Sequence, residues 1–134
     1  MNFVIDTNVL ISAAIFKGSV QDKAFDKARD LGSIISSELV YAELKEVINR
    51  NKFDRYFKAG DRSKFLARYK AESKFIVVTH RVSKCIDPND DMFLELALSG
   101  KATAIISSDP DLLILNPFQS ISIITPKDFI EQHH

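Results

Sequence analysis

Acidic residues border apolar sequence at four places in this 134-residue chain. They are Asp6, Glu43, the neighbouring pair Asp90 and Asp91, and Asp109. A carboxylate close to buried apolar surface costs free energy unless a cation or hydrogen bonds compensate it. Oxygen ligands of this kind suit Mg²⁺ or Mn²⁺, whereas zinc prefers histidine and cysteine sets that this chain lacks. The four acidic places therefore predict a Mg²⁺ or Mn²⁺ site.

Such a site would be suited to phosphoester hydrolysis. Two unit charges about 4 Å apart repel by roughly 4 kcal/mol at an effective dielectric of 20, and a bound cation reverses that penalty. The cation can generate hydroxide and stabilise an in-line displacement, while a carboxylate that does not bind it orients the attacking water. Other chemistries are disfavoured: the chain has no nucleotide-binding glycine loop and no G-x-S-x-G motif, and Cys85 with His80 is an isolated pair.

Each acid also has an ordinary structural interpretation. Asp87, Asp90, Asp91 and Asp109 could cap helices and complement their dipoles, and one cap contributes roughly 0.5–2 kcal/mol. Glu43 could pair with a lysine or an arginine. Asp6 has less structural purpose at the end of a strand, and the joint pattern favours one shared site over separate roles.

The elements that must position these acids alternate between strand and helix patterns. Short apolar runs predict strands at residues 3–6, 33–36, 75–79, 104–107 and 121–124. Helical periodicity and capping residues predict helices at 7–16, 20–31, 37–49, two within 53–74, and further helices at 87–99, 110–113 and from Pro126. This order is typical of an α/β fold with a parallel sheet covered by helices.

A parallel sheet would bring the acids to one place. The carboxyl ends of its strands share one edge, where ligands bind, and Asp6 and Asp109 each follow a strand. Glu43 lies four residues from Leu39 in its helix, so we expect it to point toward the sheet, and Asp90 has the equivalent place in the helix that it opens.

Four segments of the chain, taken together, resemble PIN-domain nucleases. They are Asp6–Ala13, the helix that contains Glu43, Asp87–Ala97 and Ser107–Leu113. Their order and spacing match the family over nearly the whole chain. The resemblance implies a three-layer α/β/α sandwich with a Rossmann-like, mainly parallel, twisted sheet of about five strands. It also implies a Mg²⁺- or Mn²⁺-dependent endoribonuclease, most similar to the VapC-like toxins of type II toxin-antitoxin pairs.

The same resemblance assigns roles to individual residues. By position, Asp6, Glu43, Asp90 and Asp109 match the family's acidic quartet. Asn8, Ser107 and Asp111 match its supporting polar positions, with Asp111 a further candidate metal ligand. Asp91 stands where the family often has asparagine and could share the role of Asp90, while Ser108 and Pro110 replace the usual glycine and basic residue. An antitoxin partner and a homodimer are also implied.

Positive charge is concentrated in residues 45–74, which contain ten lysines and arginines against four acids, whereas the whole chain has no net charge. Interleaved aromatic residues give this segment the composition of a surface that follows a phosphate backbone and stacks unpaired bases. The alternative is two amphipathic helices with core aromatics and a solvated basic face. Arg50, Lys52 and Arg55 are the candidate RNA-binding residues, although the segment could instead dock an acidic antitoxin peptide.

Composition predicts one domain over residues 1–134, because 46% of the residues are hydrophobic. A single cysteine excludes an internal disulfide and fits a reducing cytosol. The N-terminus lacks a basic region, and Asp6 and Asn8 interrupt its apolar run, so we expect a cytoplasmic protein without a membrane partner. His133 and His134 are interpreted as a possible tag remnant.

Two other function classes fit the sequence less well than RNA hydrolysis. A noncatalytic RNA- or protein-binding module of the same fold would be expected to lack part of the acidic quartet, which this chain retains. A metal-dependent phosphatase would use the same acids on small phosphate esters.

Overall fold

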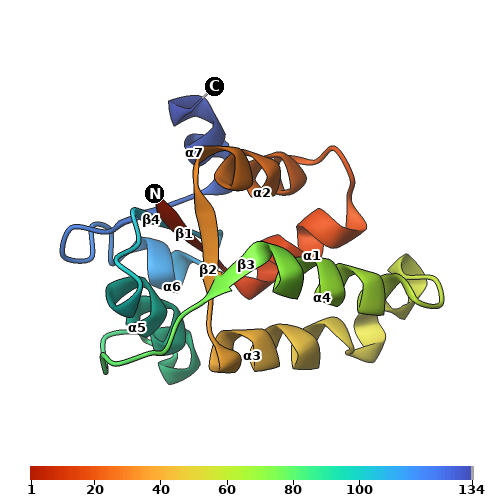
Figure 1. The fold of residues 1–134 in the computed structure, drawn as a ribbon, viewed down its shortest axis with the longest axis horizontal. Helices are drawn as coiled ribbons and strands as arrows, with labels where there is room; N and C mark the ends of the chain where they lie inside the picture. Colours follow the sequence, from red (N-terminus) through yellow and green to blue (C-terminus); the bar gives the residue numbers. More distant parts are fainter. Residues whose placement is uncertain (134) are drawn as a thin grey trace.

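The fold is a five-stranded, entirely parallel sheet with helices on both faces (Figure 1). This computed structural model describes residues 1–133; His134, part of the suggested tag remnant, lies outside them. The strand order is β3-β2-β1-β4-β5. The strands are β1 (Asn2–Ile5), β2 (Ser33–Ser36), β3 (Ser73–Phe75), β4 (Ala104–Ile106) and β5 (Ser122–Ile124). The predicted α/β/α fold class is therefore confirmed.

Alternation along the strands supplies two apolar layers. In β1, Phe3 and Ile5 belong to one buried cluster and Val4 to the other. β4 repeats the pattern, with Ile106 in the first cluster and Ile105 in the second. Because helices cover both faces of a parallel sheet, its central strands must be apolar on both sides. This requirement explains why the apolar runs in the sequence were continuous.

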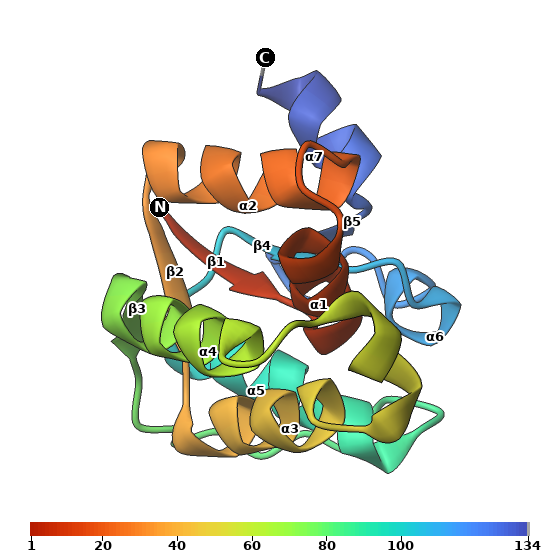
Figure 2. The same cartoon turned by 90° about the vertical axis from the view of Figure 1, so that its right-hand side faces the viewer.

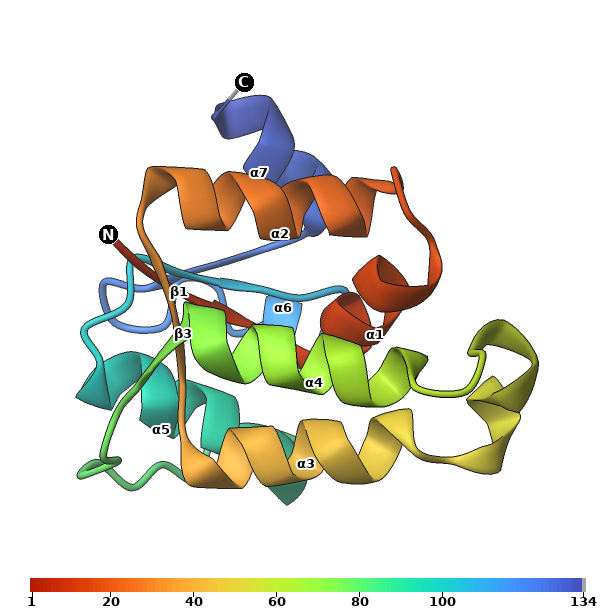
Figure 3. The same ribbon diagram turned by 45° about the vertical axis from the view of Figure 1, so that its right-hand side comes forward.

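Helices cover the sheet in two layers, with α2 and α7 on one face and α5 on the other (Figure 2). Helix α3 lies beside α4 and α5 (Figure 3). The α-helices are α1 (Thr7–Ile15), α2 (Val20–Leu31), α3 (Glu38–Ile48), α4 (Asp61–Glu72), α5 (Asp91–Ser99), α6 (Pro110–Leu113) and α7 (Pro126–Gln132). Two 3-10 helices, η1 (Asn51–Tyr56) and η2 (Pro88–Asp90), precede α4 and α5. Within residues 1–133, no helix has the length and apolar character needed to cross a membrane.

The third strand was predicted wrongly. It was expected at residues 75–79, but β3 ends at Phe75, and the last bond to β2 is donated by the Ile76 N–H to Ser36. The chain then leaves the sheet and runs along α5, where three side chains accept backbone N–H bonds. Asp91 accepts from residues 84 and 85, Glu95 from residue 82 and Ser99 from residues 79 and 80. The β-branched residues of this stretch therefore mark an extended connection rather than a strand.

Two predicted helices also differ in detail. Residues 53–74 were expected to contain two helices, whereas the structure has η1 at 51–56 and a single α-helix, α4. The helix expected from residue 87 is divided, because η2 forms first and α5 begins at Asp91. Ser37 caps α3, since its Oγ accepts from the Val40 N–H at 3.2 Å.

Candidate active site

The candidate site lies where β1 and β4 end side by side. From β1 the chain continues to β2 on one side of the sheet, while β4 and β5 lie on the other. In such sheets the reversal of strand order marks the usual ligand site, beyond the carboxyl ends of the strands, and we call this place the crevice. Asp6 follows β1 directly, and Ser107 and Asp109 follow β4, so the topology brings together residues about a hundred positions apart.

Asp6 is the most deeply buried of the acids, with 5% of its surface exposed. It caps α1 by accepting the Asn8 N–H at 3.1 Å through Oδ1, and its Oδ2 accepts the Ser107 hydroxyl at 2.5 Å. Burial raises the pKa of Asp6 above its usual value, these two hydrogen bonds oppose the rise, and the charges of Asp109 and Glu43 add to it. Asp6 is thus both a helix cap and a member of a repulsive acidic group.

Ser107 links the two strand-terminal acids. Its hydroxyl donates to Asp6, and its Oγ also accepts the Asp109 N–H at 3.0 Å. Asp109 in turn caps α6, because its Oδ1 accepts the Asp111 N–H at 2.9 Å. Ser107 is fully buried, so its position between the Asp6 carboxylate and the Asp109 N–H is fixed by packing. Asp111 takes part here through its backbone.

Glu43 reaches the same group from α3, where the Thr7 hydroxyl donates a short hydrogen bond to its Oε2. The side chain is half-buried and points toward α1. The reason given for this orientation was partly wrong, because Leu39 is 58% exposed and does not share a buried stripe with Glu43. Val40 and Leu44 form the buried face of α3, and Glu43 lies beside it.

The neighbouring acids Asp90 and Asp91 have different environments. Burial, a side-chain hydrogen bond with Asp109 and the charges of Asp109, Asp87 and Asp6 together raise the pKa of Asp90 to about 7. Asp91 points instead to the preceding connection, where its Oδ1 accepts the N–H groups of residues 84 and 85 at 3.1 and 2.8 Å. Burial acts to raise the pKa of Asp91, but these backbone bonds outweigh it and lower the pKa. Asp90 thus faces the acidic group, and Asp91 holds a loop.

Comparison with known proteins places the chain in a family. The sequence profile of the PIN domain matches residues 2–111, a range that contains all four acids of the proposed quartet. The chain belongs to the PIN-domain family of nucleases. It is also 31% identical over 139 residues to uncharacterized protein MJ1680 of Methanocaldococcus jannaschii, an alignment that covers 96% of this chain and 89% of the relative.

A solved structure supports the PIN fold independently of sequence. VapBC2 from Rickettsia felis, crystallised with a DNA fragment from its promoter, matches with a TM-score of 0.63, over 92% of this chain and 97% of the matched chain. Sequence identity is 14%, so the likeness concerns the fold. The sandwich inferred from strand and helix patterns is therefore the PIN architecture.

The donor set of this PIN domain suits a hard divalent cation. The acids grouped here are carboxylates, and burial, together with repulsion from neighbouring carboxylates, raises the pKa values of Asp6 and Asp90. Within residues 1–133, no three acidic, histidine or cysteine side chains are close enough to form a complete metal site. Mg²⁺ keeps several waters and needs only one or two carboxylates, so carboxylates that do not form a complete metal site can still bind it. The residues present fit such a cation chemically.

The candidate RNA-binding residues lie on an exposed part of this PIN domain. Arg50 pairs with Glu46 at 2.8 Å, and the Lys52 ammonium lies 5.1 Å from the ring centre of Phe53. Arg55 lies over Tyr56, at 4.9 Å from its ring centre. Each of the three cations therefore already has a neighbour within the protein.

Two residues of the crevice were missed in the sequence. Thr7 holds Glu43 and is 5% exposed, and Asp87 raises the pKa of Asp90 through its charge. A threonine directly after a strand-terminal acid was the available signal for Thr7. Asp87 was interpreted only as a helix cap, a role that it also has, because its Oδ1 accepts the Asn89 N–H.

Proposed function

We propose that this PIN domain is a Mg²⁺- or Mn²⁺-dependent endoribonuclease that hydrolyses RNA phosphodiester bonds. The observation that supports it is the electrostatic coupling of four carboxylates from four separate elements. The charges of Asp109 and Glu43 act on Asp6, and those of Asp109 and Asp6 act on Asp90. Carboxylates that repel one another at partly buried positions destabilise a protein without a counter-ion, and this favours a site built for a cation.

Each acid has a distinct part in the proposed mechanism. Asp6, Asp90 and Asp109 would hold the cation, with Asp111 as a further candidate, while Asp91 would act by holding the preceding connection through the N–H groups of residues 84 and 85. The cation, when bound, supplies charge neutralisation at the scissile phosphate and an activated water. Glu43 orients or deprotonates that water, since its Oε2 is fixed by Thr7 and it lies near Asp6. Ser107 fixes Asp6 and Asp109 relative to each other through its hydroxyl, and Asn8 fixes Asp6 through its N–H.

The proposal extends to a cellular role as the toxin of a type II toxin-antitoxin pair. It is supported by family membership and by the fold shared with VapBC2. An antitoxin protein partner, a homodimer and a cytoplasmic location form part of this proposal.

Metal-dependent RNA cleavage is the direct test. Purified protein is stripped with chelator and assayed on single-stranded RNA with Mg²⁺, with Mn²⁺ or with chelator alone. Cleavage is expected only with either cation. Equal cleavage in chelator would overturn the proposal, and so would turnover of a generic phosphate ester without RNA cleavage. Binding of RNA without any cleavage at saturating metal would favour a noncatalytic binding module.

A further inference from the structure

A second hollow lies at the other end of α1 from the acidic crevice. We call it the α1–α4 pocket; its volume is about 370 Å³, and it is lined by the last turn of α1, Lys17, η1 with the residue that follows it, and α4. Ala14, Ile15 and Phe65 contribute its apolar lining. A volume of this size falls in the range of small-ligand pockets and accommodates about one nucleotide.

The α1–α4 pocket is positively charged. Lys17, Lys64 and Arg68 line it together with one acid, Asp61, which gives a net charge of +2. Asp61 is already engaged, because its Oδ2 accepts the Lys58 N–H at 2.8 Å. Within the part of the chain that the structure describes, the Lys17 and Lys64 ammonium groups have no hydrogen bond or ion pair. Two cations are therefore available to a ligand.

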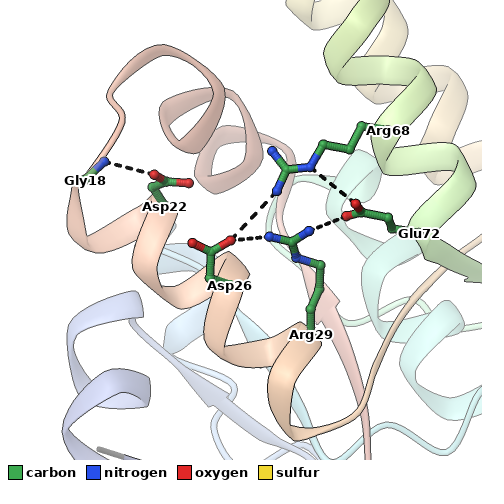
Figure 4. A network of polar contacts seen from close by, with 6 residues as sticks. All are labelled: Gly18, Asp22, Asp26, Arg29, Arg68 and Glu72. Carbon is green, nitrogen blue, oxygen red and sulfur yellow. Dashed lines mark hydrogen bonds and ion pairs between the residues drawn. The ribbon is translucent and has the colours of Figure 1, made fainter.

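Contacts with α2 hold both sides of the pocket in place (Figure 4). Arg68 lies 3.4 Å from Glu72 and 3.8 Å from Asp26, while Arg29 bridges the same two acids. The turn that carries Lys17 is fixed next to it, because the Gly18 N–H donates to Asp22 at 2.9 Å. The backbone around the two free lysines is thus ordered, although their side chains are exposed.

An aromatic side chain borders this charge. Tyr56 is 40% exposed, and its ring packs edge-on against Phe16, with 5.7 Å between the ring centres. Arg55 lies over the ring and donates to its hydroxyl at 2.7 Å, which restrains its orientation. A restrained, partly exposed ring beside cations is the arrangement on which single-stranded nucleic acids stack their bases.

We propose that the α1–α4 pocket binds a flanking nucleotide of a single-stranded RNA, with the phosphate on Lys17 and Lys64 and the base against Tyr56. This inference rests on the proposed function, since it names a substrate subsite of the same nuclease. Helix α1 is about 12 Å long from Thr7 to Ile15, so the pocket lies a few nucleotides from the crevice along a strand. The charge and the flat ring favour a nucleotide over an acidic peptide.

Binding in chelator tests the pocket separately from cleavage. A fluorescent single-stranded RNA is titrated in chelator with wild type and with the double variant Lys17→Glu/Lys64→Glu. The variant should bind about tenfold more weakly, and its log–log salt slope should be smaller by about 1.4, the value for two phosphate contacts on a single strand. The control, Lys23→Glu/Lys127→Glu, makes the same change in net charge at exposed sites outside the basic segment 45–74.

The result is independent of whether the crevice cleaves RNA, because no metal is present in the assay. If RNA binding weakens equally in the test and control variants, the proposal that this pocket binds a nucleotide is wrong, and the lysines act only through the net charge of the protein. Loss of binding to a polyglutamate peptide, with RNA binding unchanged, would also overturn it and indicate a protein-docking site. Circular dichroism and thermal melting establish that each variant is folded.

A second variant tests the stacked base. Tyr56→Leu keeps an apolar side chain against Phe16 but removes the flat ring. It should weaken single-stranded RNA binding by about fivefold, the lower end of the contribution of one base stacked on an aromatic ring. Binding of inorganic polyphosphate, which has no base, should be unchanged. An equal loss for both ligands would contradict stacking on Tyr56.

Discussion

The two ends of α1 differ in how their charges are held. At the N-terminal end, Asp6 is buried, and hydrogen bonds from Ser107 and Asn8 fix both of its oxygens. At the C-terminal end, Lys17 and Lys64 are exposed. Fixed, desolvated acids suit chemistry that needs precise geometry, whereas exposed lysines give long-range attraction that tolerates movement. One helix thus separates a place suited to cleavage from a place suited to binding.

Removing a charge at the acidic end should have the largest effect. Asp6→Asn keeps a cap for α1 but removes a carboxylate from the crevice, so we expect kcat/KM on RNA to fall by roughly 10²-fold or more. RNA binding in chelator should not weaken, because the change reduces negative charge. Asp128→Asn, an exposed change on α7, serves as the control. Full activity in Asp6→Asn would remove the distinction between the two ends.

Loosening an acid without removing it should have a smaller effect. Thr7→Val keeps the shape of the side chain but removes the hydroxyl that holds Glu43. One hydrogen bond to a charged group contributes about 1.5–3 kcal/mol, so kcat should fall by about tenfold with KM unchanged. Thr7→Ser retains the hydroxyl and should restore most of the rate. A rise in KM alone would place Thr7 in substrate binding instead.

Added salt should weaken RNA binding at the basic end of α1 but should not change the rate of cleavage at the acidic end. If two lysines contact phosphates, a fourfold rise in monovalent salt should weaken single-stranded RNA binding by about sevenfold. The rate of single-turnover cleavage at saturating RNA should stay constant. The Lys17→Glu/Lys64→Glu variant should show a flatter response. A salt effect on the saturated rate would mean that the exposed cations contribute to chemistry.

The pH dependence of stability should show the smallest effect. The pKa of Asp90 is raised from 3.8 to about 7, so its folded form binds a proton more tightly than its unfolded form. In chelator, its stabilising contribution is present below about pH 4 and is lost as pH rises through 7. Melting temperature should therefore fall across this window, and Asp90→Asn should reduce the fall. If melting temperature falls with pH equally in wild type and Asp90→Asn, the pKa of Asp90 is not raised in the folded protein.

Much of the fold was predictable because it depends on local patterns. Four strands and the caps at Ser37 and Asp109 follow from apolar runs and side-chain chemistry. Asp6 was expected to have less structural purpose, but it caps α1, so that expectation was wrong. β3 was misplaced because residues 76–79 have strand composition, whereas their position is decided by hydrogen bonds to a helix later in the chain. Composition cannot distinguish these two environments.

The grouping of the acids was predictable from the sequence, but the directions of their side chains were not. Parallel topology and family resemblance indicated Asp6, Glu43 and Asp109, whose mutual influence the structure then describes. The separate directions of Asp90 and Asp91 depend on a helix boundary that falls between them, which a sequence locates only within a few residues. The α1–α4 pocket was foreseen only in part: Tyr56, Lys64 and Arg68 lie in the basic segment 45–74, whereas Lys17 and the end of α1 come from a distant part of the sequence.

The connection between β3 and α5 should behave unlike an ordinary loop. Asp91, Glu95 and Ser99 are spaced by four residues, one turn of α5 apart, and bind successive stretches of the connection. Its amides at residues 79, 82 and 85 should therefore exchange with deuterium as slowly as those of a paired strand. Inserting one residue there would shift every later donor past its acceptor, so this segment should tolerate substitution but resist changes in length.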